Sequence, residues 1–120
     1  METATPRHLT ASENAPLDAA LERIAATAGT SILALESVPA AIATFKATNG
    51  DPLTAVRAAA GLGGDTDTIA SIAGALAGAL SGPASLPADW IAAVEEASGV
   101  DLAALAAALR RAPRPAPGTR

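Results

Sequence analysis

Apolar residues recur every three or four positions along most of this chain, and glycine or proline separates one such run from the next. That spacing predicts a series of amphipathic helices. The expected helices are 16–28, 37–48, 53–60, one from near Asp67 to the Gly82-Pro83 break, one carrying Trp90, Ile91 and Val94, and one from Leu102 to Arg111.

Start and stop signals agree with these runs. Asn14 and Pro16 fit a helix cap and first turn, and Gly29 fits the end of the same helix. The run Asn49-Gly50-Asp51-Pro52 predicts a turn followed by a cap, and Asp101 is the expected cap of the last helix. We therefore expect a flexible lead-in at 1–14, a helical region at 15–111 and a disordered, proline-rich tail at 112–120.

The helix that follows Asp67 has two faces of different character. Ile69, Ile72, Ala73, Leu76 and Leu80 lie along one face at helical spacing. Ala70, Gly74 and Gly78 form a stripe of small residues along another. A glycine inside a helix costs up to about 1 kcal/mol relative to alanine, so this stripe predicts a closely packed neighbouring helix.

Composition limits the kinds of protein that this chain can be. It has 120 residues, of which 50% are hydrophobic but only 2% aromatic, so a thin core of small residues is expected. The net charge of −4 gives no electrostatic footprint for nucleic acid, and no apolar run is long enough to span a membrane. Cysteine is absent, His8 is the only histidine, and no signal peptide is recognised, so we expect a cytoplasmic protein.

The most informative stretch is Gly61-Leu62-Gly63-Gly64-Asp65-Thr66-Asp67-Thr68, which leads directly into the helix described above. Its carboxylates and hydroxyls are hard oxygen ligands of the kind that Mg²⁺, Mn²⁺ or Ca²⁺ prefers. The glycines allow a ligand to approach the backbone, and the start of a helix offers unpaired N–H groups to an anion. The stretch therefore fits a site for a metal ion and an anionic ligand.

The same residue types also serve as ordinary helix caps after glycine-rich loops. Four candidate side chains are more than one cap needs, which favours the ligand site. Asp65 and Asp67 would point roughly 200° apart within a regular helix. They can converge on a cation only if Asp65 lies in the loop and Asp67 at or near the cap.

The run Gly63-Gly64-Asp65-Thr66-Asp67-Thr68, together with the small-residue helix after it, resembles the C-terminal metal-binding signature of the ADP-ribosylglycohydrolase family. The upstream run 29–41 resembles the block that precedes this signature. The resemblance covers roughly Ala15 to Ala97. It implies an all-α fold, an orthogonal multi-helix bundle that would form an incomplete part of the larger family fold.

The resemblance further implies a pair of Mg²⁺ ions, with Mn²⁺ as a possible substitute, and hydrolysis of the bond between ADP-ribose and a protein side chain or similar acceptor. By position, Asp65, Asp67 and Thr68 would be metal ligands, and Gly63 and Gly64 would contact the bound ligand. The family's N-terminal Thr-Asp-Asp metal motif has no counterpart here, and no catalytic residue is assigned. The expected partners are ADP-ribose or an ADP-ribosylated protein, with a complementing chain or self-association also open.

Two further hypotheses come from the same residues. Without the second acidic motif, the chain could be a truncated, non-catalytic module that binds ADP-ribose, a nucleotide or a partner protein, or a fragment of a longer coding sequence. Glu36, placed just ahead of the helix expected at 37–48, would either interact favourably with the helix dipole or anchor a metal-bound water.

Overall fold

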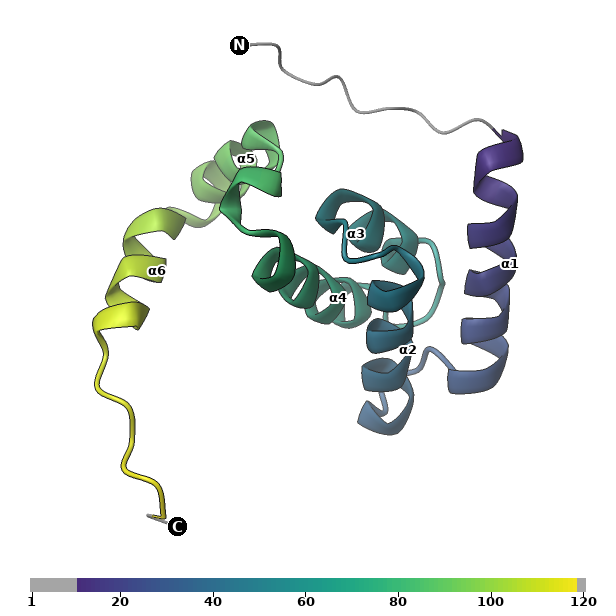
Figure 1. Cartoon of the computed structure of the whole chain (residues 1–120), viewed down its shortest axis with the longest axis horizontal. Helices are drawn as coiled ribbons and strands as arrows, with labels where there is room; N and C mark the ends of the chain where they lie inside the picture. Colours follow the sequence, from purple (N-terminus) through teal and green to yellow (C-terminus); the bar gives the residue numbers. More distant parts are fainter. Residues whose placement is uncertain (1–10, 119–120) are drawn as a thin grey trace. The chain divides into compact units, whose positions relative to one another are not determined.

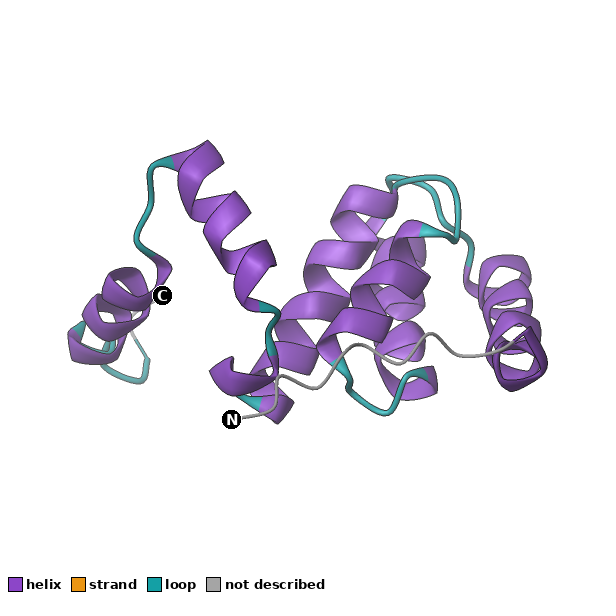
Figure 2. Cartoon of the chain, turned by 90° about the horizontal axis from the view of Figure 1, so that it is seen from above, coloured by secondary structure: helices purple, strands orange, loops and turns teal. Residues whose placement is uncertain are grey.

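The computed structural model describes residues 11–118, with the side chains of 11–13 left out, and every regular element in that range is helical (Figures 1 and 2). The elements in order are α1 (Ala11–Ala28), α2 (Ala34–Ala47), α3 (Pro52–Ala60), α4 (Thr66–Ser81), a 3-10 turn η1 (Pro83–Ser85), α5 (Ala88–Ser98) and α6 (Leu102–Arg111). The prediction of an all-helical fold is therefore confirmed. The chain divides after Ser85 into two compact units.

In the first unit, α4 packs against both α3 and α2, and α1 packs against α2 (Figure 1). One buried cluster joins three of these helices: Ala40 and Ala41 from α2, Ala59 from α3, and Ile69 and Ala73 from α4. Ile69 is the only large aliphatic side chain fully buried among the described residues. The expected thin core of small residues is confirmed.

The stripe of small residues on α4 finds its neighbour in α3. A Cβ built on Gly74 would lie 2.8 Å from Cγ2 of Val56, so glycine at this position lets α3 approach closely. The prediction of close packing thus holds at Gly74. A Cβ built on Gly78 would have no described atom within 4 Å, so contact with α3 does not require glycine at this position.

The buried face of α4 differs from the expected one. Ile69, Ala73 and Ala77 are buried, whereas Leu80 is 67% exposed. The helices meet on their alanines because these permit the shortest distance between backbones. Leu76 and Leu80, which are larger, consequently lie at the edge of the contact between the helices.

Two helices begin earlier than predicted. α1 starts at Ala11 and contains Pro16, and α2 starts at Ala34 and contains Pro39. At α2, the Leu33 carbonyl accepts hydrogen bonds from the amides of Glu36 and Ser37, so the first turn closes ahead of the proline. Proline lacks the N–H that would bond to the preceding turn, so it is typical of a first turn, but here both prolines lie inside their helices.

The second unit consists of α5 and α6, joined through Gly99 in the left-handed conformation. The Asp101 carboxylate caps α6 by accepting a hydrogen bond from the Ala104 amide at 2.8 Å, as predicted. Glu95 of α5 accepts another from the Leu102 amide at 2.9 Å. Residues 112–118 form no helix, and most of the predicted lead-in, residues 1–10, lies outside the described range. No described helix has the length and hydropathy that a membrane span requires.

Candidate metal and ligand site

The glycine-rich loop runs from the end of α3 to the start of α4. Asp65 is the N-cap residue of α4, and Asp67 lies in its first turn. This placement is the one that convergence of the two carboxylates requires, with Asp65 at the edge of the loop and Asp67 one residue inside the helix. The helix begins one residue earlier than predicted, at Thr66.

The side chains of Asp65 and Asp67 meet. A hydrogen bond with the Asp65 carboxyl is the main cause that lowers the pKa of Asp67, and the backbone amides of Thr68 and of Asp67 itself lower it further. Asp67 therefore remains ionised at a pH where an isolated aspartate begins to gain a proton. Asp67 and Thr68 are exposed, and Asp65 is half-buried, so the pair faces solvent.

Asp65 does not act as a side-chain cap. Its carboxylate forms no capping hydrogen bond with α4, whereas Asp51 caps α3 through the Thr54 amide at 2.8 Å. Asp101 caps α6 in the same way. Since aspartate caps two other helices of this chain, the different arrangement at Asp65 is specific to this loop, and capping does not account for its side chain.

The two glycines of the loop have different surroundings. Both adopt positive φ, 85° at Gly63 and 69° at Gly64, a region that favours glycine. A Cβ on Gly64 would overlap the carbonyl oxygen of Thr30. At Gly63 nothing in the described part of the chain lies within 4 Å. Gly64 thus lets the loop pack on the segment before α2, while the backbone at Gly63 is open to an approaching molecule.

The segment before α2 forms the other side of the loop, a contact that the sequence did not predict. The Thr30 carbonyl accepts a hydrogen bond from the Asp65 amide at 2.7 Å. Next to it, the Ser31 amide donates to Oε2 of Glu36 at 2.9 Å. The only sequence signal for this contact was that both segments belong to runs resembling the same family.

Hard oxygen donors are present, but they do not complete a coordination shell. In the described part of the chain, no group of three or more histidine, cysteine, aspartate or glutamate side chains could hold a metal ion together. A divalent ion takes about six oxygen ligands. The Asp65 and Asp67 carboxylates are oxygen donors of the right kind, but water or residues from elsewhere would have to supply the rest of such a shell.

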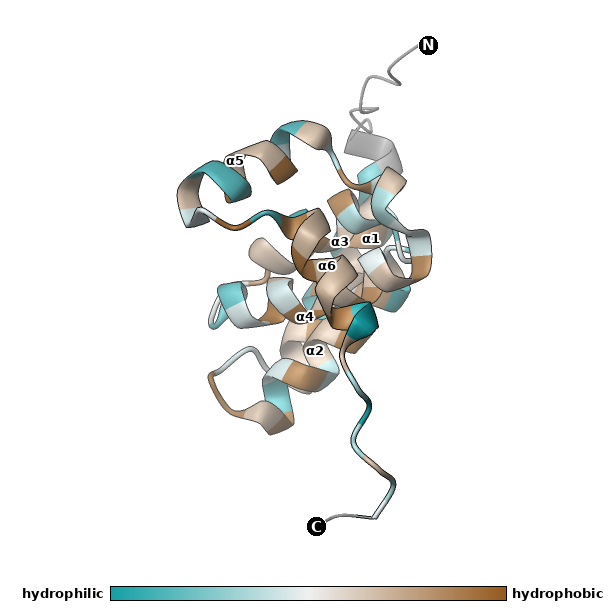
Figure 3. Cartoon of the chain, turned by 90° about the vertical axis from the view of Figure 1, so that its left-hand side faces the viewer, coloured by the Kyte–Doolittle hydropathy of each residue, from teal (hydrophilic) through white to brown (hydrophobic). Residues whose placement is uncertain are grey.

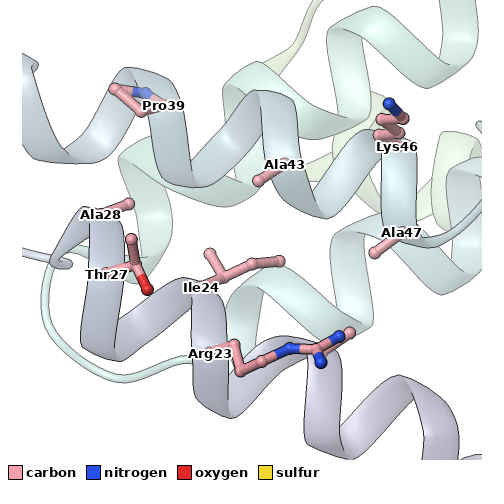
Figure 4. Close-up of a pocket in the computed structure, with 9 residues that line it drawn as sticks. Arg23, Ile24, Thr27, Ala28, Pro39, Ala43, Lys46 and Ala47 are labelled. Atoms are coloured by element: carbon pink, nitrogen blue, oxygen red, sulfur yellow. The ribbon is translucent and has the colours of Figure 1, made fainter.

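Two hollows lie on the first unit, and none of the predicted metal ligands lines either of them. One, of about 400 Å³, is lined by Asp18 and Glu22 of α1 together with Gly61 and Leu62. Both carboxylates are exposed, in agreement with their expected place on a solvated face. The other, of about 560 Å³, lies between α1 and α2. Figure 4 shows Ile24 and Ala43 pointing into it from opposite sides.

Comparison with known families decides the assignment. The family model described as ADP-ribosylglycohydrolase matches residues 2–117. The chain belongs to the ADP-ribosylglycohydrolase family. The match extends beyond the predicted range of Ala15 to Ala97 at both ends, so that range was too short. Searches of curated proteins and of solved structures gave no match.

Membership of the ADP-ribosylglycohydrolase family agrees with the all-helical architecture and supports a glycohydrolase-like function at the level of the family. The family is generally metal-dependent, and its substrates are ADP-ribosylated molecules.

Proposed function

We propose that this protein contributes the metal-binding loop of a Mg²⁺-dependent ADP-ribosylglycohydrolase site, with Asp65, Asp67 and Thr68 as metal ligands. The observation that carries the proposal is the contact between the two carboxylates at the start of α4, combined with the absence of a capping bond from Asp65. Two neighbouring carboxylates can both ligate a divalent cation through their oxygens.

Bound Mg²⁺ or Mn²⁺ would supply charge stabilisation to the bond being hydrolysed and orient the oxygens of the ribose or of the attacking water. The chain's own contribution is to keep Asp67 ionised, through the Asp65 carboxyl and the amides at the helix start. The open backbone at Gly63 would admit the ADP-ribose part of the substrate.

Hydrolysis of a glycosidic bond commonly also uses an acid–base carboxylate. We assign that role to no residue of this chain. The substrate class that we propose is ADP-ribose linked to a protein side chain or a similar acceptor.

A second candidate function is a binding module that holds ADP-ribose, a nucleotide or a partner protein without hydrolysing a bond. The observation that favours it is that no described group of three or more acidic or histidine side chains forms a metal site. Turnover of an ADP-ribosylated protein by the purified chain would exclude this alternative.

Calorimetric titration with ADP-ribose, with and without excess Mg²⁺, tests the proposal. We expect Mg²⁺-dependent binding to the wild-type chain and its loss in Asp67→Asn. Removing Mg²⁺ with a chelator should abolish the wild-type signal. Binding that persists unchanged in Asp67→Asn, or wild-type binding that does not respond to Mg²⁺, would contradict the metal role.

A further inference from the structure

The short segment that joins α1 to α2 is fixed by polar contacts and not by burial of its apolar side chains. Ile32 and Leu33 of this segment are 83% and 58% exposed, and Leu35 in the first turn of α2 is 88% exposed. Figure 3 shows this hydrophobic run between α1 and the first turn of α2. Since these side chains contribute little to its anchoring, the segment depends on the hydrogen bonds at Thr30 and Ser31.

Glu36 provides one of those anchors. Its Oε2 accepts a hydrogen bond from the Ser31 amide at 2.9 Å, and the Ser31 hydroxyl also bonds to the carboxylate. These two bonds, the hydroxyl first, lower the pKa of Glu36, so the carboxylate is charged at neutral pH. A hydrogen bond to a charged group is roughly twice as strong as one between neutral groups.

Gly29 leaves the space that the carboxylate occupies. Its φ is 82°, and a Cβ built on it would lie 2.5 Å from Oε2 of Glu36. The chain therefore turns back at Gly29 and passes directly over the Glu36 side chain. This fixes the position of the two residues that follow, Thr30 and Ser31.

Thr30 connects this segment to the glycine-rich loop before α4. The Thr30 carbonyl accepts a hydrogen bond from the Asp65 amide at 2.7 Å. The absence of a side chain at Gly64 lets the two backbone segments come this close. Two successive bonds thus connect the Glu36 carboxylate to the N-cap residue of α4: the first runs from Ser31 to Glu36, and the second from Asp65 to Thr30.

We propose that Glu36 is a positioning residue of the site: it holds the Thr30–Ser31 segment so that the Thr30 carbonyl fixes the backbone of Asp65. Glu36 touches no predicted ligand and acts only through this segment. The consequence for metal binding rests on the function proposed above. The effect on the Asp65 backbone does not.

Hydrogen exchange of backbone amides, followed by NMR, tests the positioning directly. In Glu36→Ala we expect the Asp65 amide to exchange about tenfold faster, as the loss of one hydrogen-bonded anchor implies. The Ala73 amide, in the buried part of α4, should keep its rate. Glu36→Gln, whose side-chain oxygen can still accept from Ser31, should give a smaller increase, and Glu96→Ala, at an exposed glutamate of α5, should give none.

An unchanged Asp65 rate in Glu36→Ala would overturn the proposal. Equal acceleration at Asp65 and Ala73 would also overturn it, because that result indicates loss of global stability alone. If Glu36→Ala does not fold, the Glu36→Gln variant decides, since acceleration confined to the loop supports positioning and a wild-type rate at Asp65 contradicts it.

A Mn²⁺ titration of the same variants separates this proposal from the one on which it rests. Loss of a residue that orients a metal ligand typically weakens affinity about 10- to 100-fold, and we expect a change in that range for Glu36→Ala but not for Glu96→Ala. If the wild-type chain binds no Mn²⁺, the metal function fails, and the exchange rates still decide whether Glu36 positions Asp65. If it binds and Glu36→Ala binds equally well, the role of Glu36 in the site is contradicted.

Discussion

The carbonyl of Thr30 accepts a hydrogen bond from the amide of Asp65 at 2.7 Å, joining the segment before α2 to the loop before α4. Asp65 is one of two carboxylates that converge at the start of α4. The site therefore comprises two segments that are distant in sequence, and its geometry depends on how closely they pack.

Glycine at position 64 should be essential to this packing. Gly64→Ala would place a methyl group against the Thr30 carbonyl and impose a positive φ on alanine. Gly63→Ala incurs the positive φ but meets no described atom within 4 Å. We expect Gly64→Ala to lower the free energy of unfolding by about 1–3 kcal/mol more than Gly63→Ala does.

Urea denaturation of the two variants measures this difference. Equal losses at the two glycines would show that the close contact at Thr30 does not contribute to stability. A Gly64→Ala variant as stable as the wild type would contradict both the contact and the backbone strain.

The two internal glycines of α4 should respond to alanine in opposite directions. Gly78→Ala meets no described atom within 4 Å and should stabilise the helix by up to about 1 kcal/mol. Gly74→Ala forces a methyl group against Val56, and overpacking of this kind costs about 1–3 kcal/mol, so a net loss is expected. Val56→Ala in the Gly74→Ala background should recover part of it.

Thermal unfolding of the three variants provides the measurement. A stabilising Gly74→Ala substitution would mean that α3 and α4 are not in close contact at Val56. Failure of Val56→Ala to recover stability in that background would lead to the same conclusion.

Glu36 should make stability depend on pH in the acidic range. Because hydrogen bonds from Ser31 lower its pKa in the folded protein, its contribution is fully present above the pKa of the unfolded chain. It is lost as pH falls through the lowered pKa of the folded state. We expect wild type to be more stable than Glu36→Gln at neutral pH, and the difference to shrink between about pH 5 and pH 2.

Denaturation midpoints across this pH range test the prediction, with Glu96→Gln as the matched control. Glu96→Gln removes the same charge at an exposed position of α5. If the Glu36→Gln difference changes with pH no more than the Glu96→Gln difference does, the Glu36 carboxylate does not gain its hydrogen bonds on folding.

The elements of the fold were largely predictable from local signals. The caps at Asp51 and Asp101 and the end of α1 at Ala28 follow from residue types with strong local preferences. The predicted starts of α1 and α2 are too late, because a proline is typical of a first turn whereas Pro16 and Pro39 lie inside their helices.

The site was predictable in part. The loop motif indicated Asp65, Asp67 and Thr68, and the spacing indicated how the aspartates would have to lie. The hydrogen bond from Asp65 to Thr30 was not predictable, because it depends on how α2 and α3 pack and leaves no pattern in either segment. The position of Glu36 near a helix start indicated a role for its carboxylate, but its partner, the Ser31 amide, is a backbone group and carries no sequence signal.

The most direct test of the metal site is a Mn²⁺ titration of the wild-type chain monitored by electron paramagnetic resonance, in which bound ions lose the sharp signal of the free ion. Asp67→Asn is compared with Asp89→Asn, which alters an exposed aspartate in the first turn of α5. We predict that wild type and Asp89→Asn bind Mn²⁺ alike, that added Mg²⁺ competes, and that Asp67→Asn loses binding. Equal binding by all three proteins, or none by the folded wild type, would contradict a metal site at the start of α4.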